Sequence, residues 1–297
     1  MKRWKEELPL HLLLLPGVAL VLVYSYFPMG GLVMAFQNFT PTKGIVHSEW
    51  VGLGNFTYLF SLPDTVSVIW NTIYIAVLKI IAGLLAPIAT ALLLNEMASR
   101  LFKRTIQTLI YIPHFLSWII LGGIMIDLLS PSEGAVNQAL GFLGVKPIFF
   151  LGDNRWFPLT LVVSDTWKEF GFGTIVYLAA LSGIDPALYE SAAIDGAGHW
   201  RRLWNITLPG IRPIIVLLVT LSLGQVLNAG FDQVFVLYSP PVYASGDIID
   251  TMVYRIGLVQ MQYSLATAVG LFKSVISLIL ISISYWLAYR FANYRIF

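Results

Sequence analysis

The sequence contains no cysteine and few charged residues. The absence of cysteine excludes disulfides, iron–sulfur clusters and zinc sites with thiolate ligands. Charged residues make up 11% of the 297 residues, against roughly a quarter in ordinary soluble domains. A water-soluble fold of this length could not cover its surface with so little charge. Because hydrophobic residues reach 57%, the composition predicts a polytopic membrane protein, and the net charge of +2 gives no indication of nucleic-acid binding.

The motifs of several common catalytic sites are also absent. No G-x-x-x-x-G-K-[ST] occurs, so the chain does not hydrolyse ATP by itself in the P-loop manner. Neither H-E-x-x-H nor G-x-S-x-G is present, and the histidines are scattered, so no zinc site or nucleophile elbow is predicted. The sequence therefore indicates a protein that forms a transport pathway rather than an enzyme. We expect no metal or cofactor to be bound by this chain.

Six apolar runs exceed the roughly 20 residues that a helix needs to cross the bilayer core. We expect one all-α transmembrane domain over residues 1–297. Its spans would cover residues 10–36, 65–94, 105–129, 157–181, 214–238 and 266–291. The first run follows a basic start, as in a signal peptide, but it is too long for one and lacks a small-residue cleavage site. We therefore interpret it as a retained span.

The basic residues predict the orientation. With the N-terminus inside, eleven lysines and arginines fall in the inner segments and four in the outer loops. The inner residues are Lys2, Arg3, Lys5, Arg100, Lys103, Arg104, Arg201, Arg202, Arg212, Arg290 and Arg295. The outer residues are Lys43, Lys146, Arg155 and Arg255. Because short inner loops carry the excess of basic residues in membrane proteins, both termini are predicted to face the cytoplasm.

Polar residues inside the spans are costly and are therefore candidates for function. In the fourth span, Asp165, Lys168 and Glu169 have the i, i+3, i+4 spacing that places them on one helix face. They could line a cavity that meets a polar ligand, or form an internal ion pair that locks neighbouring helices, and the spacing leaves both open. Trp167 beside them could stack on a sugar ring, although packing is the commoner reason for such a ring.

In the fifth span, Gln225, Asn228 and Asp232 (i, i+3, i+7) would share one helix face near the bilayer centre. Two amides and one carboxylate at that depth suit hydrogen bonds to a hydroxyl-rich substrate. Hydrogen bonding between helices is the alternative.

Two lysines complete the set of charges in the spans. Lys79, midway along the second span, needs a partner or a wet cavity, while Lys273, nearer the outer face, could snorkel. Trp118 is a weaker candidate for the same pathway. Because acidic residues offset the lysines, the charge balance does not decide whether a substrate is acidic or neutral.

A polar segment, residues 182–213, separates the fourth and fifth spans. The distribution of basic residues predicts that it lies in the cytoplasm. Asp185 is suited to cap a helix whose first position is Pro186, where the missing N–H costs nothing. That helix would end near Gly196, because glycine is the usual residue past a helix end.

A second short helix is predicted after the first, and Pro209 and Pro213 close the segment. Its apolar positions recur at i, i+3, i+4 and i+8 and are Trp200, Leu203, Trp204 and Leu208. Arg201 and Arg202 fall off this apolar stripe. Two short helices with an apolar face between membrane spans indicate a docking surface.

This segment resembles the EAA loop of binding-protein-dependent ATP-binding-cassette importers. The family pattern is E-A-A-x-x-x-G, nine residues, and then I-x-L-P. The chain has Glu190-Ser191-Ala192-Ala193-Ile194-Asp195-Gly196, nine residues, and then Ile206-Thr207-Leu208-Pro209. Ser191 replaces the first alanine, a small-for-small change. The rest of the chain resembles the sugar permeases of the oligosaccharide type, in stretches such as YIPHFLSW and YSLATAVGLFKS.

The resemblance implies the fold of type I importer permeases, with the EAA loop (183–213) in the cytoplasm of a bacterium and the spans in its cell membrane. It implies pairing with a second permease, which family likeness favours as a distinct chain rather than a copy. Two ATPase subunits, which use ATP and Mg, and an extracytoplasmic solute-binding protein would complete the importer of an oligosaccharide.

Residue roles follow from the same resemblance. Glu190 would make polar contact with the ATPase, and Gly196 would provide the turn between the short helices. The tryptophans of the apolar stripe would fill a cleft in the ATPase or brace the loop against the spans. Arg201 and Arg202 could pair with acidic groups at the cleft rim or with anionic lipid heads. An ordinary loop resting on the membrane surface is the alternative.

Two other classes of protein remain open from the residues alone. A secondary transporter would need intramembrane carboxylates for ion coupling and would show inverted repeats. Asp165, Glu169 and Asp232 leave this class conceivable, but no repeat is apparent in the sequence. A membrane-embedded enzyme acting on lipid-linked sugar would need an acid, base or metal constellation, and none is found.

Overall fold

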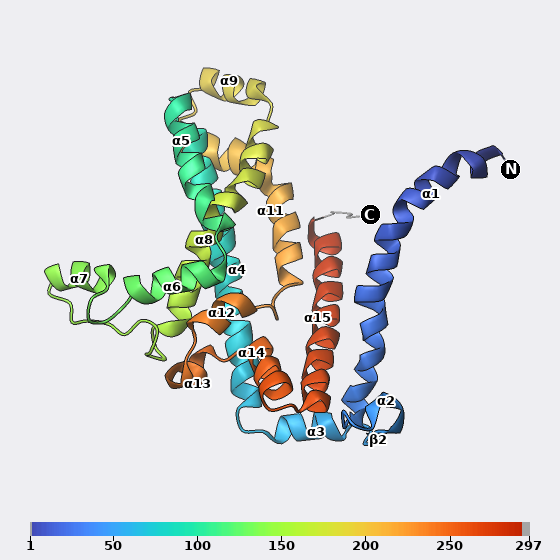
Figure 1. Cartoon of the computed structure of the whole chain (residues 1–297). Helices are drawn as coiled ribbons and strands as arrows, with labels where there is room; N and C mark the ends of the chain where they lie inside the picture. Colours follow the sequence, from blue (N-terminus) through green and yellow to red (C-terminus); the bar gives the residue numbers. More distant parts are fainter. Residues whose placement is uncertain (1, 293–297) are drawn as a thin grey trace. The chain divides into compact units, whose positions relative to one another are not determined.

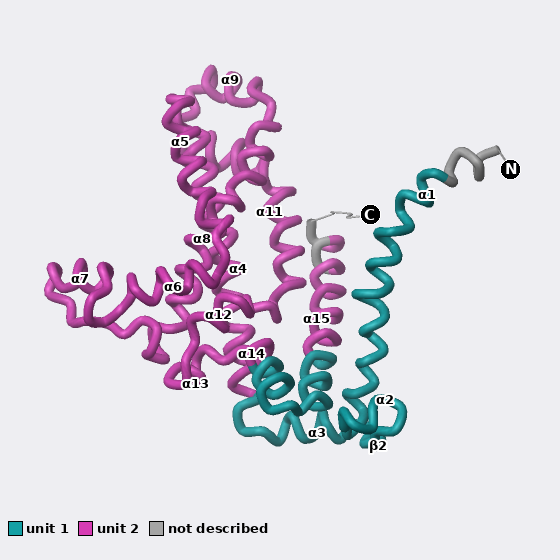
Figure 2. The backbone as a smooth tube through the Cα atoms, viewed as in Figure 1, with its two compact units in different colours: residues 1–65, 252–272 teal, residues 66–251, 273–297 magenta. Residues whose placement is uncertain are grey.

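The structure is a computed structural model that describes residues 2–292, and it consists almost entirely of helices (Figure 1). The chain divides into two compact units, coloured separately in Figure 2. Unit 1 contains the residues up to 65 together with 252–272, and unit 2 contains 66–251 and the residues from 273 onward. Arg295, which the count of basic residues includes, lies outside the described residues.

Unit 1 begins with a long apolar helix. α1 (Lys2–Val21) continues through a π-helical turn (Leu22–Tyr26) into a 3₁₀ segment (Phe27–Phe36). Pro28 stands at the start of the 3₁₀ segment, where its missing N–H interrupts the α-helical hydrogen bonds. The predicted first span, residues 10–36, is therefore helical throughout, with a change of helix type.

The loop after this helix is compact. Its elements are β1 (Gln37–Asn38), α2 (Gly44–His47), β2 (Glu49–Trp50) and α3 (Gly54–Ser61), with β1 and β2 antiparallel. Asn55 Nδ2 donates hydrogen bonds to the carbonyl oxygens of Ala35 and Gln37, both at 2.9 Å. Because these bonds use carbonyls at the end of the first span, they fix the loop to that end.

Unit 2 holds most of the other helices. Its first half consists of α4 (Thr65–Asn95), α5 (Arg100–Tyr111), a 3₁₀ turn (Ile112–Phe115), α6 (Trp118–Leu128), α7 (Ala135–Phe142) and α8 (Phe157–Ser182). Its second half consists of α9 (Pro186–Ile194), α10 (His199–Arg202), a π-helical turn (Leu203–Thr207), α11 (Leu208–Leu223), α12 (Phe231–Leu237), a 3₁₀ turn (Pro240–Val242) and α13 (Tyr243–Gly246). The chain runs through both units in α14 (Ile249–Tyr254), a π-helical turn (Arg255–Val259) and α15 (Tyr263–Ala292).

Among the described residues, four helices are long and apolar enough to cross a membrane, and two bent helix pairs bring the total to as many as six. The four are Pro9–Phe36, Thr65–Asn95, His199–Leu223 and Tyr263–Trp286. The pairs are Arg100–Phe115 with Trp118–Leu128 and Phe157–Ser182 with Pro186–Ile194. The prediction of an all-α membrane protein is confirmed.

The third predicted span, residues 105–129, is not one continuous helix. α5 and α6 meet at an angle of 103°. Pro113 supplies no N–H at the end of α5, and Ser117 Oγ then accepts a hydrogen bond from Ile120 N at 3.4 Å, which caps the new helix. Both residues lie inside an apolar run, so hydropathy alone did not reveal the break.

The fifth predicted span, residues 214–238, differs from the structure at its start. One helix runs from His199 to Leu223, because α10, the π-helical turn and α11 follow one another without a break. The prediction of a separate second short helix in this segment is therefore wrong, because the helix continues past Pro209 and Pro213. Pro209 follows the π-helical turn directly, where the regular α-helical hydrogen bonding is already interrupted, so its missing N–H is accommodated within the continuous helix.

The same span also differs in its outer half. The chain leaves the helix after Leu223 and resumes helical structure in α12. Gly230, just before α12, has a φ of +89°, a left-handed conformation that glycine adopts without a steric penalty. Gln225 and Asn228 therefore lie in this break, and the predicted helix face that they share with Asp232 does not exist.

Buried side chains form clusters within the described part of unit 2, and α8 contributes to two of them. The larger contains Ile75, Ala76, Met125, Phe157, Leu161, Ala229, Val234, Leu237, Val242 and Ile248. The smaller contains Ala91, Tyr177, Leu181 and Ile211. Because lipid tails are as apolar as these side chains, close packing rather than water exclusion favours the contacts in the bilayer. Gly171 illustrates this closeness, since a Cβ there would lie 2.0 Å from the Ile110 carbonyl oxygen.

Candidate functional site

The loop 183–213 folds locally as the sequence predicts for its first helix. Asp185 Oδ1 accepts a hydrogen bond from Ala187 N at 2.9 Å, and Pro186 occupies the first helical position of α9. The helix ends at Ile194, and Gly196 has a φ of +70°. Because a β-carbon is strained at this φ, glycine at position 196 lets the chain turn sharply toward α10.

The motif residues of this loop lie at the surface. Glu190, Ser191, Asp195, Gly196, Arg201 and Pro209 are exposed, while Ala192 and Leu208 are half-buried. Large apolar side chains in the same loop are exposed as well: Ile194 by 88%, Trp200 by 71% and Trp204 by 65%. Apolar side chains gathered in a polar loop are typical of a surface that a partner covers.

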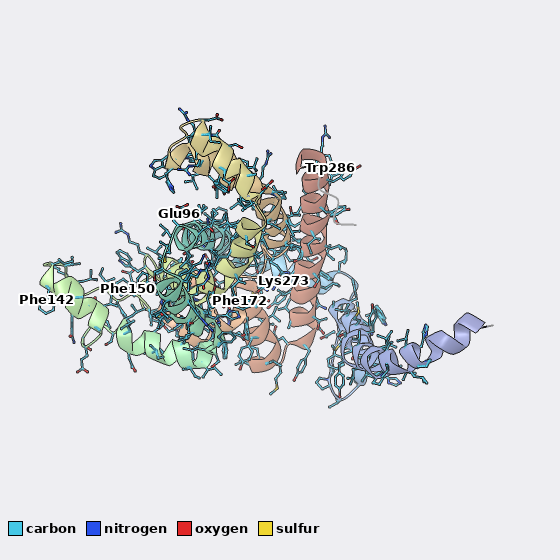
Figure 3. The ribbon with its side chains drawn as sticks, turned by 90° about the horizontal axis from the view of Figure 1, so that it is seen from above. Glu96, Phe142, Phe150, Phe172, Lys273 and Trp286 are labelled. Carbon is cyan, nitrogen blue, oxygen red and sulfur yellow. The ribbon has the colours of Figure 1, made fainter. Side chains whose placement is uncertain are left out.

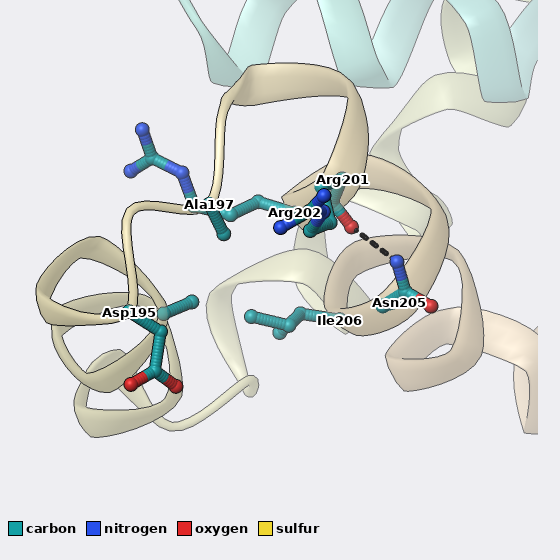
Figure 4. A pocket seen from close by; sticks show the side chains of 7 residues that line it. Asp195, Ala197, Arg201, Arg202, Asn205 and Ile206 are labelled. Atoms are coloured by element: carbon teal, nitrogen blue, oxygen red, sulfur yellow. Dashed lines mark hydrogen bonds between the residues drawn. The ribbon is translucent and has the colours of Figure 1, made fainter.

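A hollow of about 510 Å³ lies between the two helices of the loop (Figure 4). Its lining residues are Ala192, Asp195, Ala197, Arg201, Arg202, Asn205 and Ile206. Asn205 Nδ2 donates a hydrogen bond to the Arg201 carbonyl oxygen at 2.8 Å. The lining therefore contains one carboxylate, from Asp195, and two guanidinium groups, from Arg201 and Arg202.

A second cavity, of about 440 Å³, lies at the break between α11 and α12. Four of the predicted pathway residues meet there: Lys79, Asp165, Gln225 and Asn228. Ala76, Ile80, Gly83, Leu218, Leu221, Ser222, Ala229 and Gly230 complete the lining. Asn228 Nδ2 donates to Gln225 Oε1 at 3.4 Å, and both amide side chains are exposed. This cavity thus presents two amides and a carboxylate, the groups that hydrogen-bond sugar hydroxyls.

The cluster predicted on one face of α8 is divided between two partners. Asp165 Oδ1 lies 3.4 Å from Lys79 Nζ of α4, whereas Lys168 Nζ lies 2.8 Å from Glu169 Oε1. Lys168 Nζ also donates to the His114 carbonyl oxygen at 2.8 Å, and His114 Nδ1 lies 2.6 Å from Glu169 Oε2. Lys168 and Glu169 therefore brace the bend between α5 and α6 and do not line the cavity at the break.

Aromatic rings reinforce this bend. The His114 ring stacks on Phe172 with centroids 4.0 Å apart, and Lys168 Nζ lies 5.9 Å from the centroid of the Trp118 ring. Phe172, on α8, is 43% exposed, and Phe142 is carried outward on α7 (Figure 3). Trp118 is thus a packing partner of Lys168 in the structure, and it is not among the residues that line the cavity at the break.

The remaining predicted residues lie elsewhere. Trp167 lines an apolar hollow of about 530 Å³ between α6 and α8, together with Trp156 and Phe150. Asp232 is exposed on α12. Lys273 Nζ lies 2.5 Å from Asp250 Oδ1, so a carboxylate partner accounts for this charge.

Sequence reasoning missed the roles of two polar residues. Gln233 is fully buried and hydrogen-bonds to two other helices of unit 2, α4 and α8, and His114 holds the bend described above. The polarity of Gln233 within an apolar stretch was a signal for a partner, but the sequence could not say which one. His114 lies in the YIPHFLSW stretch next to Pro113, where a helix break could have been suspected.

The chain belongs to the family described as binding-protein-dependent transport system inner membrane component, which residues 80–293 match. The class indicated by the EAA loop is therefore confirmed: the protein is a multi-pass membrane component of a transport system.

Similarity to individual proteins extends over nearly the whole chain. The chain is 43% identical over 288 residues to the polygalacturonan/rhamnogalacturonan transport system permease protein YteP of Bacillus subtilis, covering 97% of this chain and 90% of that protein. It is 42% identical to protein LplB of the same organism, covering 99% and 92%. A chain in the crystal structure of a bacterial ABC transporter involved in the import of the acidic polysaccharide alginate matches with a TM-score of 0.90 and 39% identity, covering 98% of each chain. The predicted importer-permease fold is thus confirmed.

Proposed function

We propose that this chain is the permease subunit of an ATP-driven importer of oligosaccharides. The observation that carries the proposal is the loop 183–213, which exposes the motif from Glu190 to Gly196 and the tryptophans of the apolar stripe at the protein surface. In this proposal, each of two ATPase subunits receives such a loop from one permease, and the second permease is a distinct chain. The translocation pathway forms between the two permeases.

Coupling would pass through this loop. Because α10 and α11 form one continuous helix with the π-helical turn between them, a displacement of the loop by the ATPase would be carried directly into the fifth span. Closure of the ATPase pair would then rock the spans and alternate access to the cavity at the break. Glu190 would make the polar contact, and Ile194 and Trp200 would fill the ATPase cleft.

The substrate class is proposed from the relatives and from the cavity. YteP is named for polygalacturonan and rhamnogalacturonan transport, and the similar solved transporter imports alginate. In this chain, Gln225, Asn228 and Asp165 supply amide and carboxylate groups to the cavity at the break. These groups suit the hydroxyls of an oligosaccharide, which an extracytoplasmic solute-binding protein would deliver, as in the solved complex with a pentasaccharide-bound periplasmic protein.

The chain itself would do no chemistry. ATP and Mg would be used by the partner ATPase, because the sequence carries no P-loop. Both termini and the loop 183–213 would face the cytoplasm of a bacterial cell, as the excess of basic residues on that side favours.

Co-purification tests the proposal directly. The tagged full-length chain is extracted from membranes, and the proteins that remain bound are identified by mass spectrometry. We expect a second permease and a chain with a Walker A motif among the bound proteins. After reconstitution in proteoliposomes, ATP hydrolysis should rise when the solute-binding protein and an oligogalacturonide mixture are added. A preparation that lacks any ATPase chain yet moves sugar down an imposed ion gradient would instead identify a secondary carrier.

A further inference from the structure

In the break of the fifth span, a lysine side chain from another span forms a hydrogen bond with the backbone. Between Leu223 and Phe231 the backbone leaves the helical ladder, and carbonyl groups without a partner are costly at membrane depth. The Ala229 carbonyl oxygen accepts a hydrogen bond from Lys79 Nζ of α4 at 2.7 Å, and Ala229 itself is fully buried. A side chain from another span thus satisfies the backbone of the break.

The contact between Lys79 and the break is close. A Cβ at Gly230 would lie 2.9 Å from Lys79 Nζ, so the ammonium packs against the backbone where φ is +89°. Glycine at this position therefore meets two requirements, the left-handed conformation and the room for the lysine.

Gln233 connects the same lysine to α8. Its Oε1 accepts a hydrogen bond from Lys79 Nζ, while its Nε2 donates to the Leu161 carbonyl oxygen and to Ser164 Oγ, both at 2.8 Å. Gln233 is fully buried. Its amide therefore joins α4, α8 and α12 at one point, directly after the break.

Asp165 completes the group and balances its charge. Its carboxylate lies 3.4 Å from Lys79 Nζ, and its side chain is 26% exposed, against 9% for the lysine. The lysine is thus turned toward protein partners and the carboxylate is the more open of the two toward the cavity. A lysine with three oxygen partners has no ammonium proton left for a substrate anion.

We propose that Lys79 is a positioning residue of the translocation pathway, which holds the segment 224–230 in place through Ala229 and Gln233 so that Gln225 and Asn228 face the cavity. The inference rests on the proposed function, in which the cavity at the break is part of the sugar pathway. Lys79 does not itself bind a sugar carboxylate. Substitution of this lysine loosens the segment and acts on transport only through the amides that the segment carries.

The absence of cysteine makes a direct test possible, because each introduced thiol is the only one in this chain. Asn228→Cys reports on the segment, and Ser132→Cys, exposed in the loop before α7, serves as the control. Each is combined with Lys79→Met or Lys79→Arg in the full-length chain, and labelling by a small water-soluble methanethiosulfonate is timed in native membranes. The experiment needs no sugar, so its outcome is independent of whether the chain imports one.

We expect Lys79→Met to raise the labelling rate at position 228 several-fold and to leave position 132 unchanged. Lys79→Arg, whose guanidinium retains donors for the Ala229 carbonyl and Gln233, should restore the original rate. If Lys79→Met does not accumulate in membranes, the double variant Lys79→Met/Asp165→Leu removes both charges and should give the same increase. An unchanged rate at position 228 in Lys79→Met, or in the double variant, would overturn the inference.

A transport measurement distinguishes a lysine that positions the segment 224–230 from a lysine that binds a carboxylate of the substrate. In proteoliposomes with the complete importer, Lys79→Met should raise the apparent KM by the same factor for an oligogalacturonide and for its methyl-esterified, uncharged form. A rise confined to the charged form would assign the lysine to the substrate and contradict the positioning role.

Discussion

Tyr189 and Thr207 are linked across the loop 183–213: the Tyr189 hydroxyl lies 3.0 Å from Thr207 Oγ1. Tyr189 belongs to α9 and Thr207 to the π-helical turn that leads into α11. Thr207 is buried, and its Oγ1 also lies 3.4 Å from the Arg202 carbonyl oxygen. This bond therefore joins the helix that carries the motif to the helix that continues into the membrane.

Removing the Tyr189 hydroxyl should weaken that connection. A hydrogen bond of this kind contributes about 1 kcal/mol, so Tyr189→Phe should leave the chain folded while sugar import per ATP hydrolysed falls. Import and hydrolysis are measured together in proteoliposomes. Tyr74→Phe, on the exposed side of α4, is the matched control and should behave as the unmodified chain. Equal coupling ratios in Tyr189→Phe and Tyr74→Phe would show that the bond transmits nothing.

The turn after α9 depends on the left-handed conformation of Gly196. A Cβ at this position would meet no atom within 4 Å, so Gly196→Ala suffers conformational strain alone. The strain amounts to about 1–2 kcal/mol for a residue with a β-carbon. We therefore expect that less ATPase subunit co-purifies with the Gly196→Ala chain and that sugar uptake is lower.

Gly198 offers a control in the same loop. A Cβ there would also meet nothing within 4 Å, and its φ of −67° is open to any residue. Gly198→Ala should therefore retain the ATPase and the uptake rate. If Gly196→Ala and Gly198→Ala behave alike, the conformation of residue 196 has no bearing on docking.

The cavity at the break predicts a difference between two polar residues that the sequence placed on one face. Asn228 lines the cavity, whereas Asp232 is exposed on α12 and is absent from the lining. Asn228→Leu should raise the apparent KM for the oligosaccharide, because an amide that meets substrate hydroxyls is lost. Asp232→Leu should leave the KM unchanged. Uptake is measured in proteoliposomes. The reverse pattern would show that the substrate meets Asp232 on α12 rather than Asn228.

The sequence predicted the helices and the docking loop because local rules determine them. Asp185, Pro186 and Gly196 each act within a few residues of their own position, and all three take the predicted places at the start of α9 or just past its end. Apolar length alone located the first, second, fourth and sixth spans, whose predicted ranges all lie within helices of the structure.

The breaks and the charge pairs could not be predicted in the same way, because they depend on contacts between distant residues. Lys79 and Asp165 are far apart in the chain, and only packing of α4 on α8 brings them to 3.4 Å. The i, i+3 spacing favoured Lys168 as the partner of Asp165, but that lysine is held at the bend by the His114 carbonyl. Gly230 was a visible signal for the break in the fifth span, yet its neighbours are apolar enough to continue a helix.

The central claim is that the loop 183–213 couples this permease to an ATPase, and Glu190→Ala tests it most directly. Glu190 is exposed on α9, so its removal disturbs no packing within the described part of the chain. The complete importer is reconstituted with its solute-binding protein and an oligogalacturonide mixture, and uptake and ATP hydrolysis are measured on the same vesicles. The account predicts normal membrane levels of the chain, lost uptake, and hydrolysis that no longer responds to the loaded binding protein. Normal uptake with responsive hydrolysis in Glu190→Ala would contradict it.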